Sequence, residues 1–277
     1  MYRQPKIIMA ILVALFSAAP LSAQLAAPNS AGVSWGHIHL NVTDVEAHTR
    51  IWTEHFGGRV VDLEMFRTIS LPNTIIMLND RAPTGGTVGS SLNHFGFSVP
   101  DVETFLARWR AAGLEVESEF EGPGGLPQAF LLLPDGIRVE LDQVPSLDVP
   151  AIPYHVHIYT GGDPSELRDW FAERFSMESR ERGNNPFTAD VPGMNVSFTA
   201  SEEKPAPNRG RAVDHIGFEI EGLENFVQKL IAMGVVFDVE VEYRVVEGRT
   251  VGVAFFTDAS GTFWELTEGL DDLAGSY

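Results

Sequence analysis

The organisation of this sequence is set by four short stretches in which a histidine opens an apolar run: Gly36-His37-Ile38-His39-Leu40, Asn93-His94-Phe95-Gly96-Phe97, Tyr154-His155-Val156-His157-Ile158 and Asp214-His215-Ile216-Gly217-Phe218. Their leading histidines recur after 57, 61 and 60 residues. Self-similarity at a nearly fixed spacing is the signature of an internal structural repeat. The sequence therefore predicts four copies of one folding unit.

Each unit is predicted to have the same order of elements. A strand begins at the histidine, and a helix of about a dozen residues follows, because apolar residues recur there at a spacing near 3.6. In the second unit these residues are Val102, Phe105, Leu106 and Trp109. Two or three β-type runs close each unit, for example residues 74–78, 137–141, 195–199 and 251–256. The order is thus close to βαβββ, and the predicted fold class is α+β.

The repeat has a second level. The first and third units carry His-x-His, whereas the second and fourth carry His-x-Gly-Phe. This pattern indicates that a two-unit domain was duplicated, and the proline-rich residues 144–153 mark the boundary. We therefore expect two domains of two consecutive units each, residues 33–143 and 152–270.

Residues 1–23 have the features of a secretory signal peptide. Arg3 and Lys6 form a positive start, residues 7–16 are apolar, and Ala23 is a suitable last residue before cleavage. The apolar run is much shorter than the ~20 residues needed to span a bilayer. The expected localisation is periplasmic or secreted, with no membrane association after cleavage.

Charge and cysteine content exclude several classes of function. The chain has 38 Asp and Glu against 19 Lys and Arg, for a formal net charge of −19. Such a field repels phosphate backbones, so no nucleic-acid partner is expected. The absence of cysteine excludes disulfides, thiolate metal sites and cysteine nucleophiles. A metal site in this chain must use histidine, carboxylate or carbonyl ligands.

Six residues stand out as metal ligands because histidine and glutamate recur among apolar neighbours, where an isolated charge is costly to bury. The second and fourth units each close with a turn followed by a strand that contains Glu140 or Glu265. Each expected domain then offers two histidines and one glutamate, a set typical of non-haem Fe(II) that also suits Mn, Ni or Zn. The predicted groups are His37, His94 and Glu140, and His155, His215 and Glu265.

The spacing, the histidine openings and the closings resemble those of the vicinal oxygen chelate superfamily. The closings are Asp-Gly-x-x-x-Glu in the second unit and Asp-x-x-Gly-x-x-x-Glu in the fourth. That superfamily includes glyoxalase I, extradiol dioxygenases, and the fosfomycin- and bleomycin-resistance proteins. The resemblance covers nearly all of residues 33–270. It implies four βαβββ modules paired into two glyoxalase-like domains, each a curved mixed sheet that forms a metal-binding cup, with the six ligands named above.

The remaining four of the eight histidines fall into two pairs. His39 and His157 come two residues after a ligand candidate, so on a strand they face the same side and are expected to point into the cup as acid–base or substrate-binding groups. His48 and His55 are expected on the surface of the first helix.

The resemblance implies a divalent-metal-dependent enzyme that binds a small molecule through two adjacent oxygens, either a dioxygenase or a glyoxalase-like lyase or isomerase. Against extradiol cleavage, residues 255–258 lack the histidine and tyrosine that the family usually has there. Against glyoxalase I proper, a secreted protein does not meet the glutathione adducts of the cytosol. The alternative is a protein of the bleomycin-resistance type, which sequesters a small molecule without turnover. The sequence leaves the substrate, the metal and the oligomeric state open.

Overall fold

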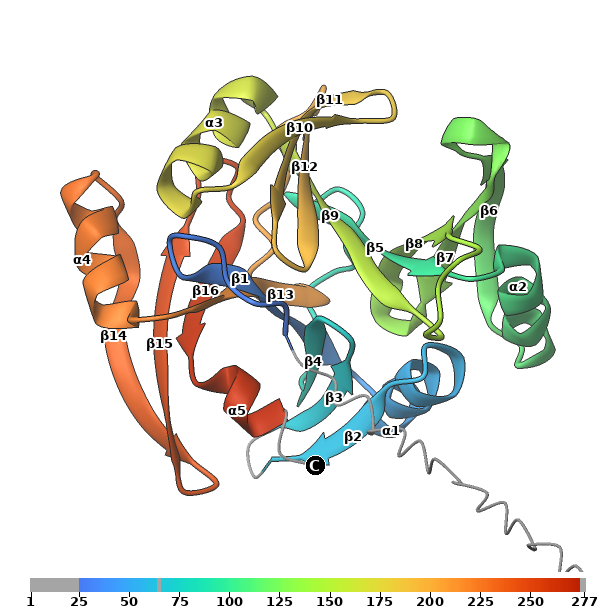
Figure 1. Cartoon of the computed structure of the whole chain (residues 1–277). Helices are drawn as coiled ribbons and strands as arrows, with labels where there is room; N and C mark the ends of the chain where they lie inside the picture. The colour runs from blue at the N-terminus through green and yellow to red at the C-terminus, as the bar shows by residue number, and fades with distance from the viewer. Residues whose placement is uncertain (1–24, 64–65, 275–277) are drawn as a thin grey trace, which may run out of the picture.

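The computed structural model describes residues 25–63 and 66–274, so the predicted signal peptide lies outside the described residues. Within these two ranges the chain forms four consecutive βαβββ units, whose strands assemble into two eight-stranded mixed sheets (Figure 1). The predicted α+β fold of four βαβββ modules, paired into two mixed sheets, is therefore confirmed.

The first sheet takes its strands from the first and fourth units. In chain order they are β1 (Val33–Val42), β2 (Arg59–Asp62), β3 (Arg67–Leu71), β4 (Thr74–Asp80), β13 (Val213–Ile220), β14 (Phe237–Val246), β15 (Arg249–Thr257) and β16 (Phe263–Glu268).

The second sheet takes its strands from the second and third units. They are β5 (Leu92–Val99), β6 (Glu115–Glu121), β7 (Pro127–Leu133), β8 (Ile137–Gln143), β9 (Ile152–Thr160), β10 (Glu178–Arg182), β11 (Asn185–Val191) and β12 (Met194–Ala200).

Each unit contributes one main helix, and a short fifth helix follows the last strand in the described part of the chain. They are α1 (Val45–Arg50), continued by the π-helical turn η1 (Ile51–His55), then α2 (Val102–Ala111), α3 (Pro164–Phe175), α4 (Leu223–Ala232) and α5 (Leu270–Ala274). Two 3-10 turns, η2 (Pro123–Gly125) and η3 (Pro134–Gly136), connect strands of the second unit.

The helices begin where the sequence offers an acceptor for their first backbone N–H groups. The carboxylates of Asp44, Asp101 and Asp163 accept hydrogen bonds from the first turns of α1, α2 and α3. At the corresponding point before α4, Gly222 adopts a positive φ instead. These caps set the direction in which each chain segment leaves its first strand.

All four units share one topology. The first strand of a unit lies parallel to its fourth strand, and the second, third and fourth strands pair with one another in antiparallel orientation. The two first strands of a sheet then pair with each other in antiparallel orientation, β1 with β13 and β5 with β9. Each sheet therefore has an approximate twofold relation about its central strand pair.

The expected domain pairing was wrong in one respect. Residues 33–143 and 152–270 do not each form a sheet, because each sheet takes one unit from either half. Figure 1 shows the blue strand β1 beside the orange strand β13, and the green and yellow strands together in the other sheet. The similarity between units shows that the two halves of the chain are alike, but it does not show whose first strand pairs with whose.

Consecutive units meet through their helices instead. Trp52 of η1 stacks on Phe95 of β5, and Phe171 of α3 packs on Trp264 of β16, with ring centroids 6.1 and 4.9 Å apart. These aromatic residues belong to one continuous buried core that spans both sheets. Burial of such large rings accounts for much of the apolar stabilisation of the fold.

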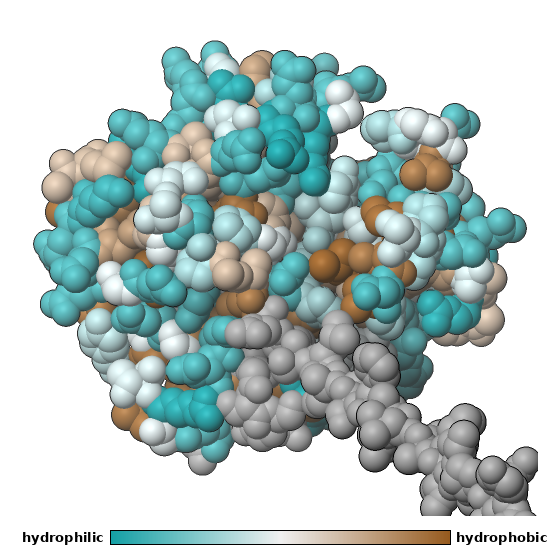
Figure 2. All heavy atoms as spheres, viewed as in Figure 1, coloured by the Kyte–Doolittle hydropathy of each residue, from teal (hydrophilic) through white to brown (hydrophobic). Residues whose placement is uncertain are grey.

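The outer surface is mostly hydrophilic on the face seen in Figure 2, with hydrophobic residues gathered in smaller patches. Among the described residues, no helix is both long enough and apolar enough to cross a membrane.

Candidate metal centres

The central strand pair of each sheet brings the candidate ligands together. In the first sheet His39 lies opposite His215 and His37 lies opposite Gly217, while Glu265 on the parallel strand β16 lies beside Gly217. Because side chains alternate along a strand, these residues project from one face of the sheet.

The first centre consists of His37, His215 and Glu265. The Oε2 atom of Glu265 lies 2.8 Å from Nε2 of His37 and 2.9 Å from Nε2 of His215. All three side chains are buried. The three donor atoms therefore converge on one point from three adjacent strands.

The second centre, made by the other sheet, consists of His94, His155 and Glu140. The Oε2 atom of Glu140 lies 3.1 Å from Nε2 of His94 and 3.4 Å from Nε2 of His155. Its residues occupy the positions that correspond to the first centre, since His94 lies opposite His157, and both His155 and Glu140 flank Gly96.

All six predicted ligands thus lie in two clusters, but the predicted grouping was wrong. His37 does not join His94 and Glu140, and His155 does not join His215 and Glu265. The two histidines exchange partners because the first strand of unit one pairs with that of unit four, and the first strand of unit two with that of unit three.

Hydrogen bonds decide which side chains of the first centre are charged. Burial disfavours protonation of His215, but its hydrogen bonds to Asp214 and Glu265 outweigh burial and raise its pKa to about 9. Burial likewise favours the neutral form of Glu265, yet its two histidine partners hold its pKa well below the ordinary value.

The second centre differs in this respect. Burial lowers the pKa of His94 to about 4, although the hydrogen bond to Glu140 acts in the opposite direction. Burial also opposes ionisation of Glu140, but hydrogen bonds from His155 and His94 keep its pKa well below the usual range. The two clusters have the same donor types and different charge distributions.

The donor set fits a divalent metal ion. Two ligand atoms that bind one ion at about 2.1 Å and at right angles lie about 3 Å apart, which agrees with the separations above. The Nδ1 atoms of His37 and His155 are buried and have no hydrogen-bond partner, so only their Nε2 atoms engage the clusters. Two imidazoles and one carboxylate suit Fe, Mn, Ni or Zn, which share these ligands.

His39 and His157 both point toward the clusters, as their strand positions predict. The Nδ1 atom of His39 lies 3.1 Å from Nε2 of His215, and that of His157 lies 3.2 Å from Nε2 of His94. Burial and the neighbouring His215 lower the pKa of His39 to about 3. In the second sheet the donor atoms of His94, His155 and His157 lie within 4.8 Å of one another, so His157 is close enough to serve as a further ligand.

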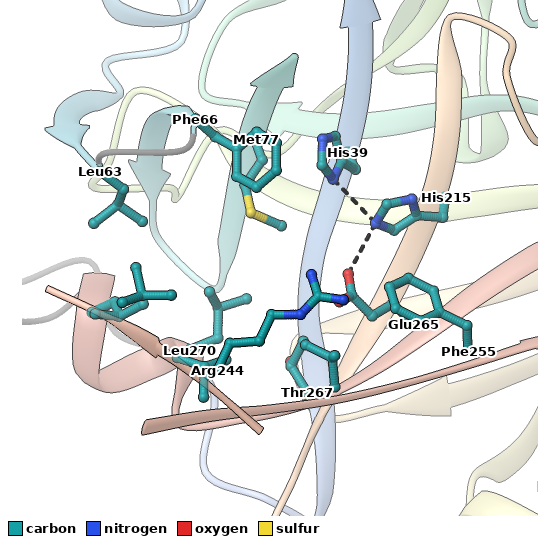
Figure 3. Close-up of a pocket in the computed structure, with 14 residues that line it drawn as sticks. His39, Leu63, Phe66, Met77, His215, Arg244, Phe255, Glu265, Thr267 and Leu270 are labelled. Carbon is teal, nitrogen blue, oxygen red and sulfur yellow. Dashed lines mark hydrogen bonds and ion pairs between the residues drawn. The ribbon is translucent and has the colours of Figure 1, made fainter. Parts of the chain in front are cut away.

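An apolar pocket of about 240 Å³ opens beside the first centre. Figure 3 shows that His39, His215 and Glu265 lie together on one side of it, and that the apolar side chains of Phe66, Met77 and Leu270 also line it. Within its described lining, Arg244 is the one cationic group other than histidine. The helix α5 contributes to the wall through its leucines, which belong to a small apolar cluster of their own.

The pocket beside the second centre is more polar and has a volume of about 460 Å³. Glu140, His155 and His157 lie in its wall together with Tyr154 and Arg182, whose guanidinium lies 4.5 Å from the tyrosine ring centroid. The two pockets therefore present different surroundings to similar donor sets.

Two histidines that were expected on the surface are buried instead. His48 is fully buried and lies 3.2 Å from the carboxylate of Asp135, and His55 packs its ring against Trp109. The helix of the first unit is covered by the second unit, which the sequence of one unit does not reveal.

The sequence interpretation also missed three residues near the centres. Asp214 and Asn93 each directly precede a candidate ligand histidine and accept a hydrogen bond from it. Their signal was present in the repeated stretches, where a residue with a side-chain oxygen precedes the histidine in both His-x-Gly units. Arg244 gave no such signal, because it lies outside the repeated stretches.

Comparison with known proteins agrees with this fold. Residues 34–141 match the family model of the Glyoxalase/Bleomycin resistance protein/Dioxygenase superfamily, so the resemblance found in the sequence is confirmed. A search among curated proteins found no match.

Solved structures share the whole architecture at low sequence identity. A variant of glyoxalase I from Zea mays has a TM-score of 0.70 at 16% identity and covers 89% of this chain and 97% of its own. The unmodified Zea mays enzyme has a TM-score of 0.68 at 16% identity, with 87% and 94% covered. A Bacillus subtilis protein with a provisional description as a dioxygenase has a TM-score of 0.67 at 13% identity, with 92% and 91% covered. At these identities the likeness shows the fold alone.

Proposed function

We propose that this protein is a divalent-metal-dependent enzyme that binds a small substrate through two adjacent oxygens. The observation that carries the proposal is the first centre itself, in which His37, His215 and Glu265 converge and the last two lie in the wall of an open pocket. Three protein ligands leave coordination positions for a substrate, which is the arrangement of catalytic rather than structural metal sites.

A bound divalent ion would polarise the substrate oxygens and stabilise the negative charge that develops on them. The remaining work falls to residues of the pocket. Val251, Val253 and Phe255 exclude water from one wall, and Arg244 offers a cationic contact to a carboxylate or a similarly charged group. The substrate that fits this pocket is a small molecule with an apolar body and an oxygen-rich end.

His39 is the group best placed to move a proton in the first pocket. Apart from the ligands His215 and Glu265, the ionisable groups of the described lining are His39 and Arg244. Arginine does not lose its proton in proteins. An imidazole next to the ligand set can accept a proton from the substrate and return it, as a lyase or isomerase requires.

The reaction is of the dioxygenase type or of the glyoxalase-like lyase or isomerase type. The fold is shared with proteins of both descriptions. In the position where an acid–base residue would serve extradiol cleavage, Phe255 contributes an apolar ring 5.5 Å from that of His215.

The first test is metal content. The purified chain is expected to bind up to two divalent ions, and E265A and E140A are each expected to lose one of them. Unchanged metal content in both variants would contradict the assignment of the centres.

The second test is turnover. The anaerobic protein is loaded with Fe(II), and oxygen consumption is followed with catechols, while isomerisation of dicarbonyls is followed with Zn²⁺ or Ni²⁺. Turnover that E265A abolishes supports an enzyme. Tight binding of these compounds without turnover of any of them would support the alternative, a sequestering protein.

We also propose that the protein acts outside the cytoplasm, on the basis of residues 1–23. N-terminal sequencing of the mature protein from the periplasmic or secreted fraction tests this. A chain that keeps Met1 and stays in the cytoplasm would contradict it.

A further inference from the structure

The two centres share a set of two histidines and one glutamate, but the residue that directly precedes one of the histidines differs between them. Directly before His215 stands Asp214, whose Oδ1 accepts a hydrogen bond of 2.7 Å from Nδ1 of that histidine. Directly before His94 stands Asn93, whose amide oxygen accepts the corresponding hydrogen bond at 2.9 Å. The geometry is nearly the same, and the acceptor carries a full negative charge only in the first centre.

Asp214 is fixed in its charged form by further donors. Its Oδ2 accepts hydrogen bonds from the backbone N–H of Gly210 at 2.8 Å and from the side chain of Asn41 at 3.0 Å. The amide of Asn41 is in turn oriented because its oxygen accepts a hydrogen bond from Asn79. The carboxylate is therefore held in place for His215.

The surroundings of Asn93 work in the opposite direction. Its oxygen also lies 3.4 Å from a guanidinium nitrogen of Arg138, which withdraws electron density from it. The residue that corresponds to Arg138 in the first centre is Phe263, which carries no charge and packs its ring against His215. Asp142, a carboxylate near the second centre, accepts a hydrogen bond from Gln128 rather than from a ligand histidine.

An anionic acceptor behind a histidine makes the opposite ring nitrogen a stronger ligand and holds the ring in its binding orientation. Loss of such a partner typically costs about 10–100-fold in metal affinity. The negative charge also attracts the cation directly, and burial reduces the screening of this attraction.

We propose that the two centres bind a divalent cation with different affinities, and that Asp214 and Asn93 act as the positioning residues that set this difference. The first centre is the tight one and the second is the weak one. This inference rests on the proposed metal-dependent function.

The test uses the full chain after removal of metal with a chelator. The Kd for Zn²⁺ is measured by competition with a chromophoric chelator in E140A, which leaves the first centre intact, and in E265A, which leaves the second. We expect the Kd of the first centre to be lower by about tenfold or more. Equal values, or a tighter second centre, would overturn the proposal.

Two nearly isosteric substitutions then assign the difference to the named residues. D214N in the E140A background is expected to raise Kd about tenfold or more, and N93D in the E265A background is expected to lower it. Because Asp214 accepts two additional hydrogen bonds, D214N also loses stability, which thermal unfolding of the metal-free protein reports separately. N93D has no such complication, and an unchanged Kd in N93D would contradict the role of this position.

Failure of this inference can be told apart from failure of the proposed function. If the wild-type chain binds no Zn²⁺ at all, the metal-dependent function fails. If it binds two ions with equal affinity, the function stands and only the inference fails.

Discussion

Gly217 faces His37 across the β1–β13 pair so closely that a methyl group on the glycine would lie 2.2 Å from Cε1 of the histidine. Gly96 has the same relation to His155 in the other sheet, at 2.6 Å. Both glycines also lie beside the strand that carries the ligand glutamate. Because these two glycines have no side chain, they leave the space in which the histidine ring of the partner unit lies.

G217A is accordingly expected to displace His37 and to release the metal ion of the first centre, while the second centre keeps its ion. The measurement is metal content per chain after reconstitution. G161A is a suitable control, since the nearest atom to its added methyl group would be 3.6 Å away. Retention of both ions in G217A would show that the first sheet relaxes around the added carbon.

The grouping of the ligands can be tested with double variants. H37A/E265A removes two ligands from one centre, so one ion per chain should remain. H37A/E140A removes one ligand from each centre, so metal content should fall toward zero. The opposite result, with one ion retained in H37A/E140A, would support the grouping by consecutive units instead.

H39Q is expected to keep the metal ion and to lower turnover by about 10²–10⁴-fold, the usual contribution of a general acid or base. The substitution removes the titrating group but not the hydrogen-bonding capacity toward His215. Metal analysis and the pH profile of turnover are measured together. Loss of the ion would identify His39 as a ligand, and unchanged turnover would exclude it from proton transfer.

Glu219 should make stability depend on pH. Burial raises its pKa from 4.5 to about 7, although hydrogen bonds from Thr267, Gly269 and Leu270 act against this. Between these values the unfolded chain has lost the proton and the folded chain keeps it, so this group's contribution to stability falls as pH rises, by up to about 1.4 kcal/mol per pH unit.

E219Q cannot lose a proton and serves as the reference. The unfolding free energy of the wild type relative to E219Q should decrease between pH 5 and pH 7 and then level off, as chemical denaturation at each pH would show. A constant difference over this range would mean that the hydrogen bonds keep Glu219 ionised in the folded chain.

The sequence was sufficient to predict the units and to select the six candidate ligands that cluster in the structure, because both leave local signals. Each strand, helix and capping aspartate lies within about sixty residues that repeat, and the histidines stand out against apolar neighbours. The direction of His39 and His157 followed from strand alternation alone. These features depend on contacts within one unit.

The partners of the units could not be predicted, for a physical reason. Pairing of consecutive units and the observed pairing both place each His-x-His strand opposite a His-x-Gly strand, so the steric fit at Gly96 and Gly217 allows both arrangements. The choice depends on long-range packing, such as that of Trp52 on Phe95, which places helices between consecutive units. His48 is buried at the same interface between the first two units, next to Asp135, and the sequence of the first unit alone gives no sign of this burial.

The exchange of units between the sheets gives the molecule the architecture of a symmetric dimer of two-unit subunits, fused end to end through residues 144–151. In such an assembly every centre is an intersubunit site. Either half of this polypeptide, expressed by itself as a monomer, would lack part of each ligand set. Two separately expressed halves that associate would form both complete sets.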